Sequence, residues 1–194
     1  MRVGLVSTKG GTGKTSSAVY LACGLHRLGR TLLIDADRQS SALSWSQQRD
    51  GLPFTVVSLP VRDLPRRADD LMAGYEHLVI DGPPGDLDLI RAVILSVDIA
   101  VVPVSPTGLD LSRLRPTFEL LAALEQVRPV EAAVLLTKVR RGTISAREAR
   151  AVLTEAGYPV LDAEIPLAEA IAGSYGSAPD SPSSYDDVLR ELMT

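Results

Sequence analysis

The feature that most constrains the fold is a glycine-rich loop between a short apolar run and a segment with helical periodicity. The apolar run covers residues 3–6 and leads into the sequence KGGTGKT at residues 9–15. After the loop, apolar residues recur at spacings of three and four up to Leu28, which is the period of an amphipathic helix. A strand, a glycine-rich loop ending in Gly-Lys-Thr and a helix, in this order, are typical of a phosphate-binding loop. The chain is therefore expected to bind a nucleotide.

Further short apolar runs alternate with helix-period segments along the chain. The expected strands are residues 3–6, 31–34, 55–57, 78–80, 99–102 and 132–136. Beyond the helix after the loop, the expected helices are residues 41–48, 64–72, 87–95, 111–127, 145–156 and 186–193, with a surface loop at 173–184. Strands that are apolar on both faces and separated by helices indicate a mostly parallel sheet covered on both sides. The predicted fold is a P-loop NTPase-like three-layer α/β sandwich, with residues 1–194 in one domain.

Composition and charge exclude several classes of protein. The lone Cys23 cannot form an intramolecular disulfide or a cysteine-rich metal site, so a reducing cytoplasm is expected. No apolar segment is long enough to cross a bilayer, and no signal-peptide pattern precedes the first run. The formal net charge of −4 argues against a surface that is basic overall. Any contact with nucleic acid therefore needs a local basic patch.

The residue types in the loop suit phosphate binding. Glycines let backbone N–H groups turn around phosphate oxygens, at the positive end of the following helix. Lys14 is expected to place its charge on the β and γ phosphates, and the Thr15 hydroxyl to ligate Mg²⁺. The residues predicted to bind the nucleotide phosphates are Gly10, Gly11, Thr12, Gly13, Lys14, Thr15 and Ser16.

Carboxylates follow two of the other expected strands. Residues 35–37 read DAD, and Asp81 begins the sequence DGPPG. Because parallel strands bring their carboxyl ends to the ligand-binding edge of a sheet, these acids are expected to meet the phosphate loop. Asp35 and Asp37 point the same way if the strand continues past Asp35. Asp81 is expected to hold Mg²⁺ through water, and residues 82–85 to form a loop that responds to the γ phosphate.

The pattern KGGxGK[ST] at residues 9–15 resembles the deviant Walker A motif of the ParA/MinD family of P-loop ATPases. The resemblance runs from residue 3 to about residue 192 and is strongest to short plasmid-type ParA partition ATPases without an N-terminal helix-turn-helix. It implies that Lys9 is a signature lysine, which reaches the nucleotide of the partner subunit in an ATP-bound homodimer. Lys9, Lys14 and Asp37 are accordingly the candidate catalytic residues.

The same resemblance implies roles for the carboxylates. Asp37 would orient the attacking water, and Asp35 would lie near Mg²⁺, so the candidate metal residues are Thr15, Asp35 and Asp81. The segment DADRQ has Arg38 where the family has proline, which leaves the shape of this loop open.

The identity of the base follows from residues 137–140, which read TKVR. Guanine-binding P-loop proteins have an aspartate at the last of these positions, where this chain has Arg140. An arginine has only donors and cannot accept the bonds of guanine, so ATP is favoured over GTP. The resemblance implies that the adenine lies near Thr137 and near Ile165 and Pro166.

A local basic patch covers residues 138–150, with five cations against one acid. On a helix from residue 145, Arg147 and Arg150 are three apart and share a face. The ParA resemblance implies DNA binding without sequence preference, and the candidate DNA contacts are Arg140, Arg141, Arg147 and Arg150. A solvated basic face with no partner is the alternative.

The function implied by the resemblance is DNA partition, of a plasmid or a chromosome. ATP and Mg²⁺ would drive homodimer formation on nucleoid DNA in the cytoplasm, and a ParB-like adaptor would stimulate an otherwise weak ATPase. One alternative is a nucleoid-based ATPase that positions a protein cargo, and another is an ATP-dependent small-molecule ligase or synthetase of the same fold. The short acidic C-terminus differs from the basic membrane-binding helix of MinD, so no membrane partner is expected.

Overall fold

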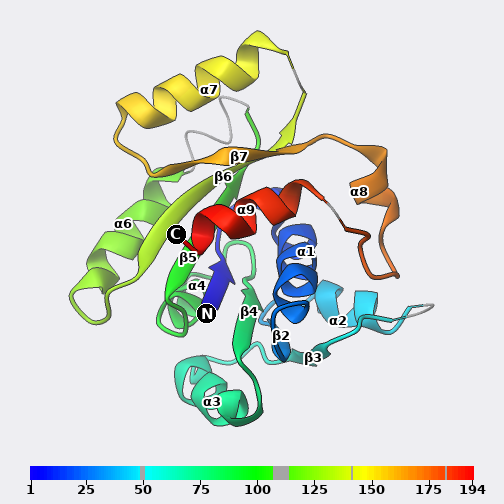
Figure 1. The fold of residues 1–194 in the computed structure, drawn as a ribbon. Helices are drawn as coiled ribbons and strands as arrows, with labels where there is room; N and C mark the ends of the chain where they lie inside the picture. Colours follow the sequence, from blue (N-terminus) through cyan, green and yellow to red (C-terminus); the bar gives the residue numbers. More distant parts are fainter. Residues whose placement is uncertain (49–50, 107–113, 141, 182) are drawn as a thin grey trace.

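A parallel sheet forms the centre of the molecule (Figure 1). The computed structural model describes residues 1–48, 51–106, 114–140, 142–181 and 183–194. These residues form a seven-stranded sheet in the order β3-β2-β4-β1-β5-β6-β7, and every neighbouring pair is parallel. The strands are β1 (Arg2–Leu5), β2 (Thr31–Asp35), β3 (Thr55–Ser58), β4 (His77–Asp81), β5 (Ile99–Val104), β6 (Glu131–Val139) and β7 (Val160–Pro166).

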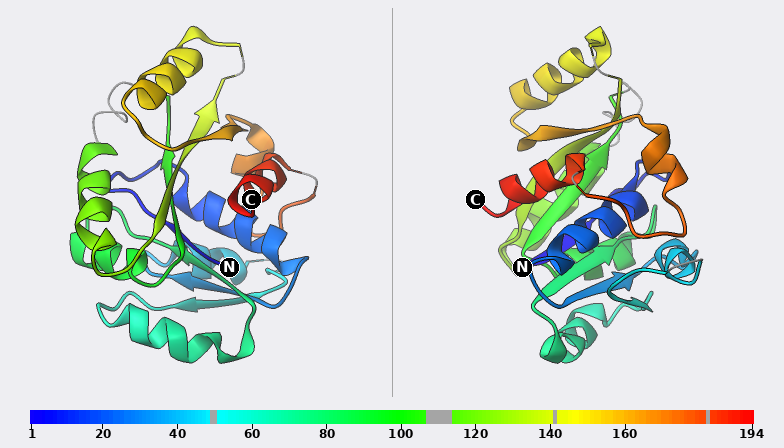
Figure 2. Two further views of the ribbon diagram at one scale, coloured as in Figure 1. Left: turned by 60° about the vertical axis from the view of Figure 1, so that its left-hand side comes forward. Right: turned by 45° about the vertical axis from the view of Figure 1, so that its right-hand side comes forward.

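Helices cover both faces of the sheet (Figure 2). They are α1 (Lys14–His26), α2 (Ser41–Ser46), α3 (Leu64–Leu71), the 3₁₀ turn η1 (Met72–Gly74), α4 (Leu87–Ile94), α6 (Leu114–Glu125), α7 (Ile144–Glu155), α8 (Glu169–Gly173) and α9 (Ser184–Leu192). Residues 111–113 of the helix predicted at 111–127 lie outside the described residues. The predicted three-layer parallel α/β sandwich is confirmed. No helix in the described parts of the chain is long and apolar enough to span a membrane.

Two apolar layers form the core, one on each face of the sheet. Leu32 and Leu33 are neighbours in β2 and belong to opposite layers, as the alternation of side chains along a strand requires. Residues of α1, α2 and α9 pack in one layer, and residues of α3, α4, α6 and α7 pack in the other. Because both faces of the inner strands are buried, the middle residues of these strands are apolar, and their polar residues lie near the strand ends.

The sequence analysis missed the edge strand β7 and the short helix α8 that follows it. Asp162 and Glu164 interrupt the apolar pattern of β7, and the pairing of β7 with β6 shifts register twice. An irregular, half-buried edge strand gives neither a continuous apolar run nor a regular alternation. The segment that links α8 to α9 is the surface loop predicted at residues 173–184.

The carboxyl ends of the central strands are level with one another. Asp81 at the end of β4 is the register partner of both Leu5 in β1 and Asp35 in β2. The glycine-rich loop leaves β1 at this edge, and α1 begins at Lys14. The predicted phosphate loop and the predicted carboxylates therefore meet at one edge of the sheet.

Candidate nucleotide-binding site

The glycine-rich loop wraps the N-terminal end of α1. Gly11 and Gly13 have φ angles of 75° and 93°, in the left-handed region that glycine adopts without steric cost. Gly13 is the N-cap residue of α1, a helix of 13 residues. The unpaired N–H groups and the positive dipole end of this helix make the loop a site for an anion.

Lys14 is a buried cation in this site. Its Nζ donates a hydrogen bond to the Lys9 carbonyl oxygen at 2.9 Å. Burial lowers the pKa of Lys14, whereas the negative charges of Asp81 and Asp37 act to raise it. The structure therefore brings the Lys14 side chain near Asp37, Asp81 and the backbone of Lys9, and the role of the Lys9 side chain in a partner subunit stays a prediction.

Asp81 is buried with its carboxylate unsatisfied. Neither Oδ1 nor Oδ2 has a well-formed hydrogen-bond partner among the described residues. Burial raises the pKa of Asp81 to about 7, while the Thr15 side chain and the Lys14 charge act in the opposite direction. A carboxylate with available lone pairs beside a threonine hydroxyl is a donor set that suits Mg²⁺. Thr15 and Asp81 thus fit the predicted magnesium site.

The carboxylate of Asp35, unlike that of Asp81, has well-formed hydrogen-bond partners for both oxygens. Its Oδ1 accepts the N–H of Asp37 at 3.1 Å, and its Oδ2 accepts the N–H of Leu43 in α2 at 3.0 Å. Burial raises the pKa of Asp35, and these backbone N–H groups act to lower it. Strand β2 ends at Asp35, so the alternation that would point Asp35 and Asp37 the same way does not apply. Asp35 shapes the loop that carries Asp37, and its contact with Mg²⁺ stays a prediction.

The loop that follows Asp81 packs against the phosphate loop. The Gly82 N–H donates to the Leu5 carbonyl oxygen at 3.0 Å. A Cβ atom at position 82 would lie 2.4 Å from that oxygen, so a side chain there would push the ends of β1 and β4 apart. Pro84 lies 3.9 Å from the position of a Cβ atom at Gly10. The two loops predicted to contact the phosphates are therefore in contact with each other.

Helix α2 follows the Asp37 loop and carries the only tryptophan of the chain. The Trp45 side chain is buried, and its Nε1–H donates to the Ser177 carbonyl oxygen at 2.9 Å. Its ring also packs against Tyr175 in a tilted arrangement, with centroids 5.2 Å apart and an angle of 49° between the ring planes. Trp45 therefore connects the Asp37 loop to the segment between α8 and α9.

The residues predicted to contact the adenine lie in three different surroundings. The Thr137 hydroxyl donates to the Thr12 carbonyl oxygen at 2.8 Å, so it contacts the phosphate loop itself. The Ile165 side chain is buried in the core, whereas Pro166 lines a hollow of about 730 Å³ together with Tyr20 and Tyr185. Their contacts with a base stay predictions.

Lys138 is a residue of this site that the sequence analysis assigned only to the basic patch. Its Nζ donates to the Gly11 carbonyl oxygen at 2.6 Å. It also lines a hollow of about 540 Å³ beside the loop, together with Lys9, Arg140 and Thr143. The usable signal was its position just past the apolar run at residues 132–136, because parallel strands end at the same edge as the loop.

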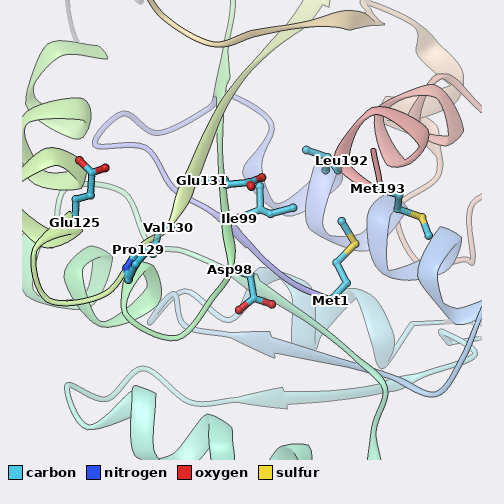
Figure 3. Close-up of a pocket in the computed structure, with 9 residues that line it drawn as sticks. All are labelled: Met1, Asp98, Ile99, Glu125, Pro129, Val130, Glu131, Leu192 and Met193. Carbon is cyan, nitrogen blue, oxygen red and sulfur yellow. The ribbon is translucent and has the colours of Figure 1, made fainter.

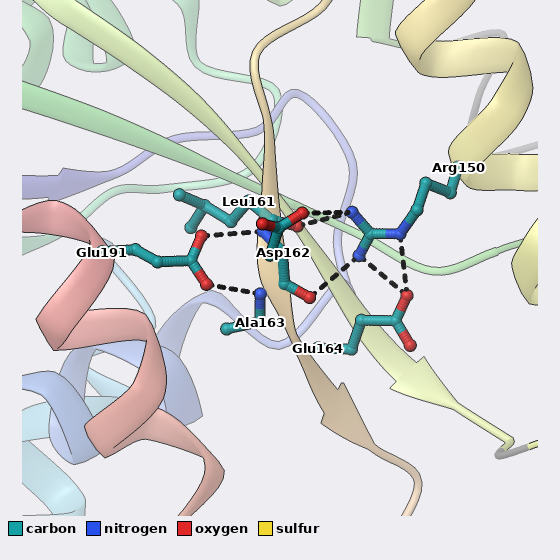
Figure 4. Close-up of polar contacts among 6 residues, drawn as sticks. All are labelled: Arg150, Leu161, Asp162, Ala163, Glu164 and Glu191. Atoms are coloured by element: carbon teal, nitrogen blue, oxygen red, sulfur yellow. Dashed lines mark hydrogen bonds and ion pairs between the residues drawn. The ribbon is translucent and has the colours of Figure 1, made fainter.

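The predicted DNA contacts separate in the structure. Arg140 and Arg147 are exposed, while Arg141 lies outside the described residues. Arg150 is on α7 but turns towards β7, where its guanidinium donates to the Leu161 carbonyl oxygen and to Glu164 Oε1, both at 2.8 Å (Figure 4). Among the described cations of the patch, Lys138, Arg140 and Arg147 are exposed, and DNA binding by any of the predicted contacts stays a prediction.

The contacts of Arg150 belong to a network that holds the irregular part of β7 (Figure 4). From the other side, the Glu191 carboxylate of α9 accepts the N–H groups of Asp162 and Ala163 at 2.7 and 2.6 Å. Arg150 binds backbone carbonyl groups of the same stretch. Side chains from α7 and α9 thus replace the ladder bonds that β7 loses where its register with β6 shifts.

A hollow of about 650 Å³ lies at the opposite edge of the sheet, where the strands begin (Figure 3). Its apolar wall includes Met1, Ile99 and Leu192, and Asp98 and Glu131 stand at its rim. None of the site residues predicted from the sequence lines this hollow. The candidate site is therefore defined by the phosphate loop and not by this hollow.

Comparison with known proteins agrees with this geometry. Residues 3–178 match the model of a family described as the CobQ/CobB/MinD/ParA nucleotide binding domain. The chain is 37% identical to Maintenance of carboxysome distribution protein A of Gloeobacter kilaueensis, over 84% of this chain and 75% of that protein. It is 29% identical to the chromosome-partitioning ATPase Soj of Thermus thermophilus, over 99% of this chain and 95% of that protein.

Among solved structures, the fold is similar to that of the septum site-determining protein MinD of Pyrococcus horikoshii in complex with Mg-ADP. The TM-score is 0.75 at 18% identity, with 98% of this chain and 95% of that chain covered. At this identity the likeness concerns the fold, and that structure contains the nucleotide and the metal ion for which the present loop and carboxylates are suited.

Proposed function

Because the chain belongs to the CobQ/CobB/MinD/ParA family of nucleotide-binding domains, we propose that it is an ATPase that forms a homodimer on DNA when ATP and Mg²⁺ are bound. The observation that carries the proposal is the convergence of the glycine-rich loop, the buried Lys14 and the carboxylates of Asp37 and Asp81 at one edge of the sheet. A cation and two acids around an anion-binding loop are the groups that phosphoryl transfer from ATP to water requires.

The residues have separate tasks in this proposal. The loop N–H groups and Lys14 bind the phosphates, and Thr15 and Asp81 hold Mg²⁺, which neutralises charge on the β and γ phosphates when bound. Asp37 orients the attacking water at the edge of the loop that Asp35 shapes. Lys9 completes the site of the partner subunit, so hydrolysis is coupled to dimer formation.

DNA binding is assigned to two exposed arginines of the patch near α7. Arg140 and Arg147 supply charge for phosphate contacts that carry no sequence information. The chain has a net charge of −4, so its affinity for DNA is expected to depend on this patch and to fall steeply with salt.

The cargo moved by such an ATPase is proposed to be a protein assembly. The identity of 37% to a protein named for carboxysome distribution supports this choice. DNA partition is the second candidate, supported by the nearly full-length match to Soj. In both cases an adaptor protein, ParB-like in the second case, binds the ATP dimer, stimulates hydrolysis and releases the dimer from nucleoid DNA.

Sedimentation with plasmid DNA tests the central proposal. The wild-type protein is expected to sediment with DNA in ATP but not in ADP or without nucleotide. Lys9→Ala should keep ATP binding and lose both the dimer and the DNA-bound fraction, whereas Lys14→Ala should lose ATP binding itself. Equal sedimentation in all nucleotide states, or a normal ATP dimer of Lys9→Ala, would contradict the proposal.

Deletion of the gene distinguishes a protein cargo from a DNA cargo. Deletion of the gene is expected to leave protein assemblies clustered in the cell if they are the cargo, and to leave plasmid and chromosome inheritance normal. Loss of plasmids or anucleate daughter cells would instead support DNA partition.

A further inference from the structure

Two side chains at the end of β6 bond to successive carbonyl groups of the phosphate loop. The Thr137 hydroxyl donates to the Thr12 carbonyl oxygen at 2.8 Å, and Lys138 Nζ donates to the Gly11 carbonyl oxygen at 2.6 Å. Thr137 is buried, and its side chain lies 3.9 Å from the position of a Cβ atom at Gly13. The last turn of the loop is therefore held from the β6 side by two donors.

These bonds determine where the N–H groups of the loop point. In a trans peptide, the carbonyl group of one residue and the N–H of the next point in opposite directions. A Gly11 carbonyl held by Lys138 directs the Thr12 N–H away from β6, and a Thr12 carbonyl held by Thr137 does the same for the Gly13 N–H. Both N–H groups belong to the stretch predicted to bind the phosphates.

The backbone of Lys138 is in a conformation that is unfavourable for a lysine. Its φ angle of 55° is in the left-handed region, which non-glycine residues adopt rarely and at a cost. This position also falls in the stretch between Leu136 and Val139 where the pairing of β6 with β7 shifts register. Strain of this kind persists where other interactions demand it, and the bond to Gly11 is such an interaction.

The distribution of lysine in the chain points to the same loop. Of the 20 basic residues other than histidine, only Lys9, Lys14 and Lys138 are lysines. Lys14 Nζ bonds to the Lys9 carbonyl oxygen and Lys138 Nζ to the Gly11 carbonyl oxygen. A compact ammonium group on a flexible stem suits a single carbonyl oxygen better than the planar fork of arginine, which every other basic position uses.

From these observations we infer that Thr137 and Lys138 form a clamp that fixes the peptide groups of Gly11 and Thr12 before a nucleotide arrives. They are positioning residues for phosphate binding, since they act through the N–H groups of Thr12 and Gly13. The inference rests on the proposed nucleotide binding and assigns Thr137 a role at the phosphates. Preorganised donors bind an anion without the cost of ordering the loop, so the clamp contributes to ATP affinity.

Substitution of Lys138 by glycine distinguishes an effect on ATP binding from an effect on the stability of the fold. Glycine removes the ammonium group and relieves the left-handed strain, so Lys138→Gly should melt at the same temperature as the wild type or higher. Its affinity for a fluorescent ATP analogue should nevertheless fall about tenfold, since a charge-assisted hydrogen bond is lost. Lys138→Asn, which also tolerates this backbone conformation, should behave in the same way.

Thr137 offers a matched pair of variants. Thr137→Ser keeps the hydroxyl donor and Thr137→Val removes it at nearly constant shape, so only the valine variant should weaken ATP binding. The association rate of the analogue should fall in the weakened variants, because the loop must then be ordered during binding. Repeating the titrations at high salt distinguishes the clamp from a through-space effect of the Lys138 charge, because only the latter is screened.

The outcomes separate the clamp from the proposed function. A wild-type protein that binds no adenine nucleotide would overturn both. ATP binding by the wild type that is unchanged in Lys138→Gly, or weakened equally in Thr137→Ser and Thr137→Val, would overturn the clamp alone. A loss of ATP affinity in Lys138→Gly, relative to the wild type, that disappears at high salt would also overturn the clamp.

Discussion

Asp35 and Asp81 are register partners on neighbouring strands, and their carboxylates have opposite surroundings. The two oxygens of Asp35 accept backbone N–H groups from Asp37 and Leu43. Those of Asp81 are buried without a well-formed partner in the described parts of the chain. One acid therefore orders a loop, and the lone pairs of its neighbour stay available, as the predicted Mg²⁺ site requires.

Asp81→Asn is expected to change how the stability of the nucleotide-free protein depends on pH. Folding raises the pKa of Asp81 from 3.8 to about 7. The protonated carboxyl therefore contributes to the free energy of unfolding fully at pH values below 3.8, and this contribution is lost as the pH rises to about 7. Asparagine does not ionise. From pH 5.5 to pH 8, the free energy of unfolding in urea should fall by about 2 kcal/mol more for the wild type than for Asp81→Asn. Parallel pH profiles of the two proteins would contradict the buried, unsatisfied carboxylate.

Asp37→Asn is expected to slow hydrolysis without disturbing the loop. Asp37 Oδ1 accepts the Gln39 N–H at 3.0 Å, and an asparagine oxygen can accept the same bond. The charge that would orient water is lost, so ATP turnover should fall at least about tenfold while ATP affinity and the melting temperature stay near wild type. A phosphate-release assay measures turnover, and unchanged turnover would remove Asp37 from the mechanism.

Arg147 and Arg150 are expected to respond differently to substitution, although both are on α7. Arg147 is exposed, so Arg147→Glu should weaken DNA binding and reduce its salt dependence, with an unchanged melting temperature. Arg150→Met should lower the stability by about 1–2 kcal/mol, because Glu164 and two β7 carbonyl groups lose their donor. Thermal unfolding and DNA titration on both variants provide the comparison. An Arg150→Met protein with wild-type stability would show that this network does not hold β7.

Cys23 is expected to be unreactive in the folded protein. Its thiol is buried in α1, and burial raises its pKa to about 12, with the Arg27 charge acting in the opposite direction. Since the thiolate is the reactive form, iodoacetamide at pH 8 should label the protein only after unfolding in urea. Rapid labelling in native buffer would contradict this packing of α1.

The fold was predictable where sequence patterns are local and regular. The inner strands are buried on both faces and appear as continuous apolar runs, so their order along the chain was readable. Strand β7 was missed because Asp162 and Glu164 break the pattern, and because side chains of Arg150 and Glu191 satisfy its backbone where the regular ladder is lost. Such compensation depends on helices that are distant in sequence.

The positions of the candidate site residues were likewise predictable where they lie next to a regular sequence pattern. The glycine-rich loop, Lys14 and Asp81 follow strands directly, and strand ends share an edge in a parallel sheet. Helical spacing placed Arg150 beside Arg147, but spacing could not show that the guanidinium reaches β7. The bond from Lys138 to Gly11 joins positions 127 residues apart, so only the three-dimensional fold reveals it.

The placement of Trp45 gives the protein an intrinsic optical probe. Its indole is buried between the helix that follows the Asp37 loop and the segment that carries Ser177, and no other tryptophan contributes to the emission. A rearrangement of that loop on nucleotide binding would alter the hydrogen bond of the indole and hence its emission wavelength. Unlabelled protein mixed rapidly with ATP would then report the movement of the loop in real time.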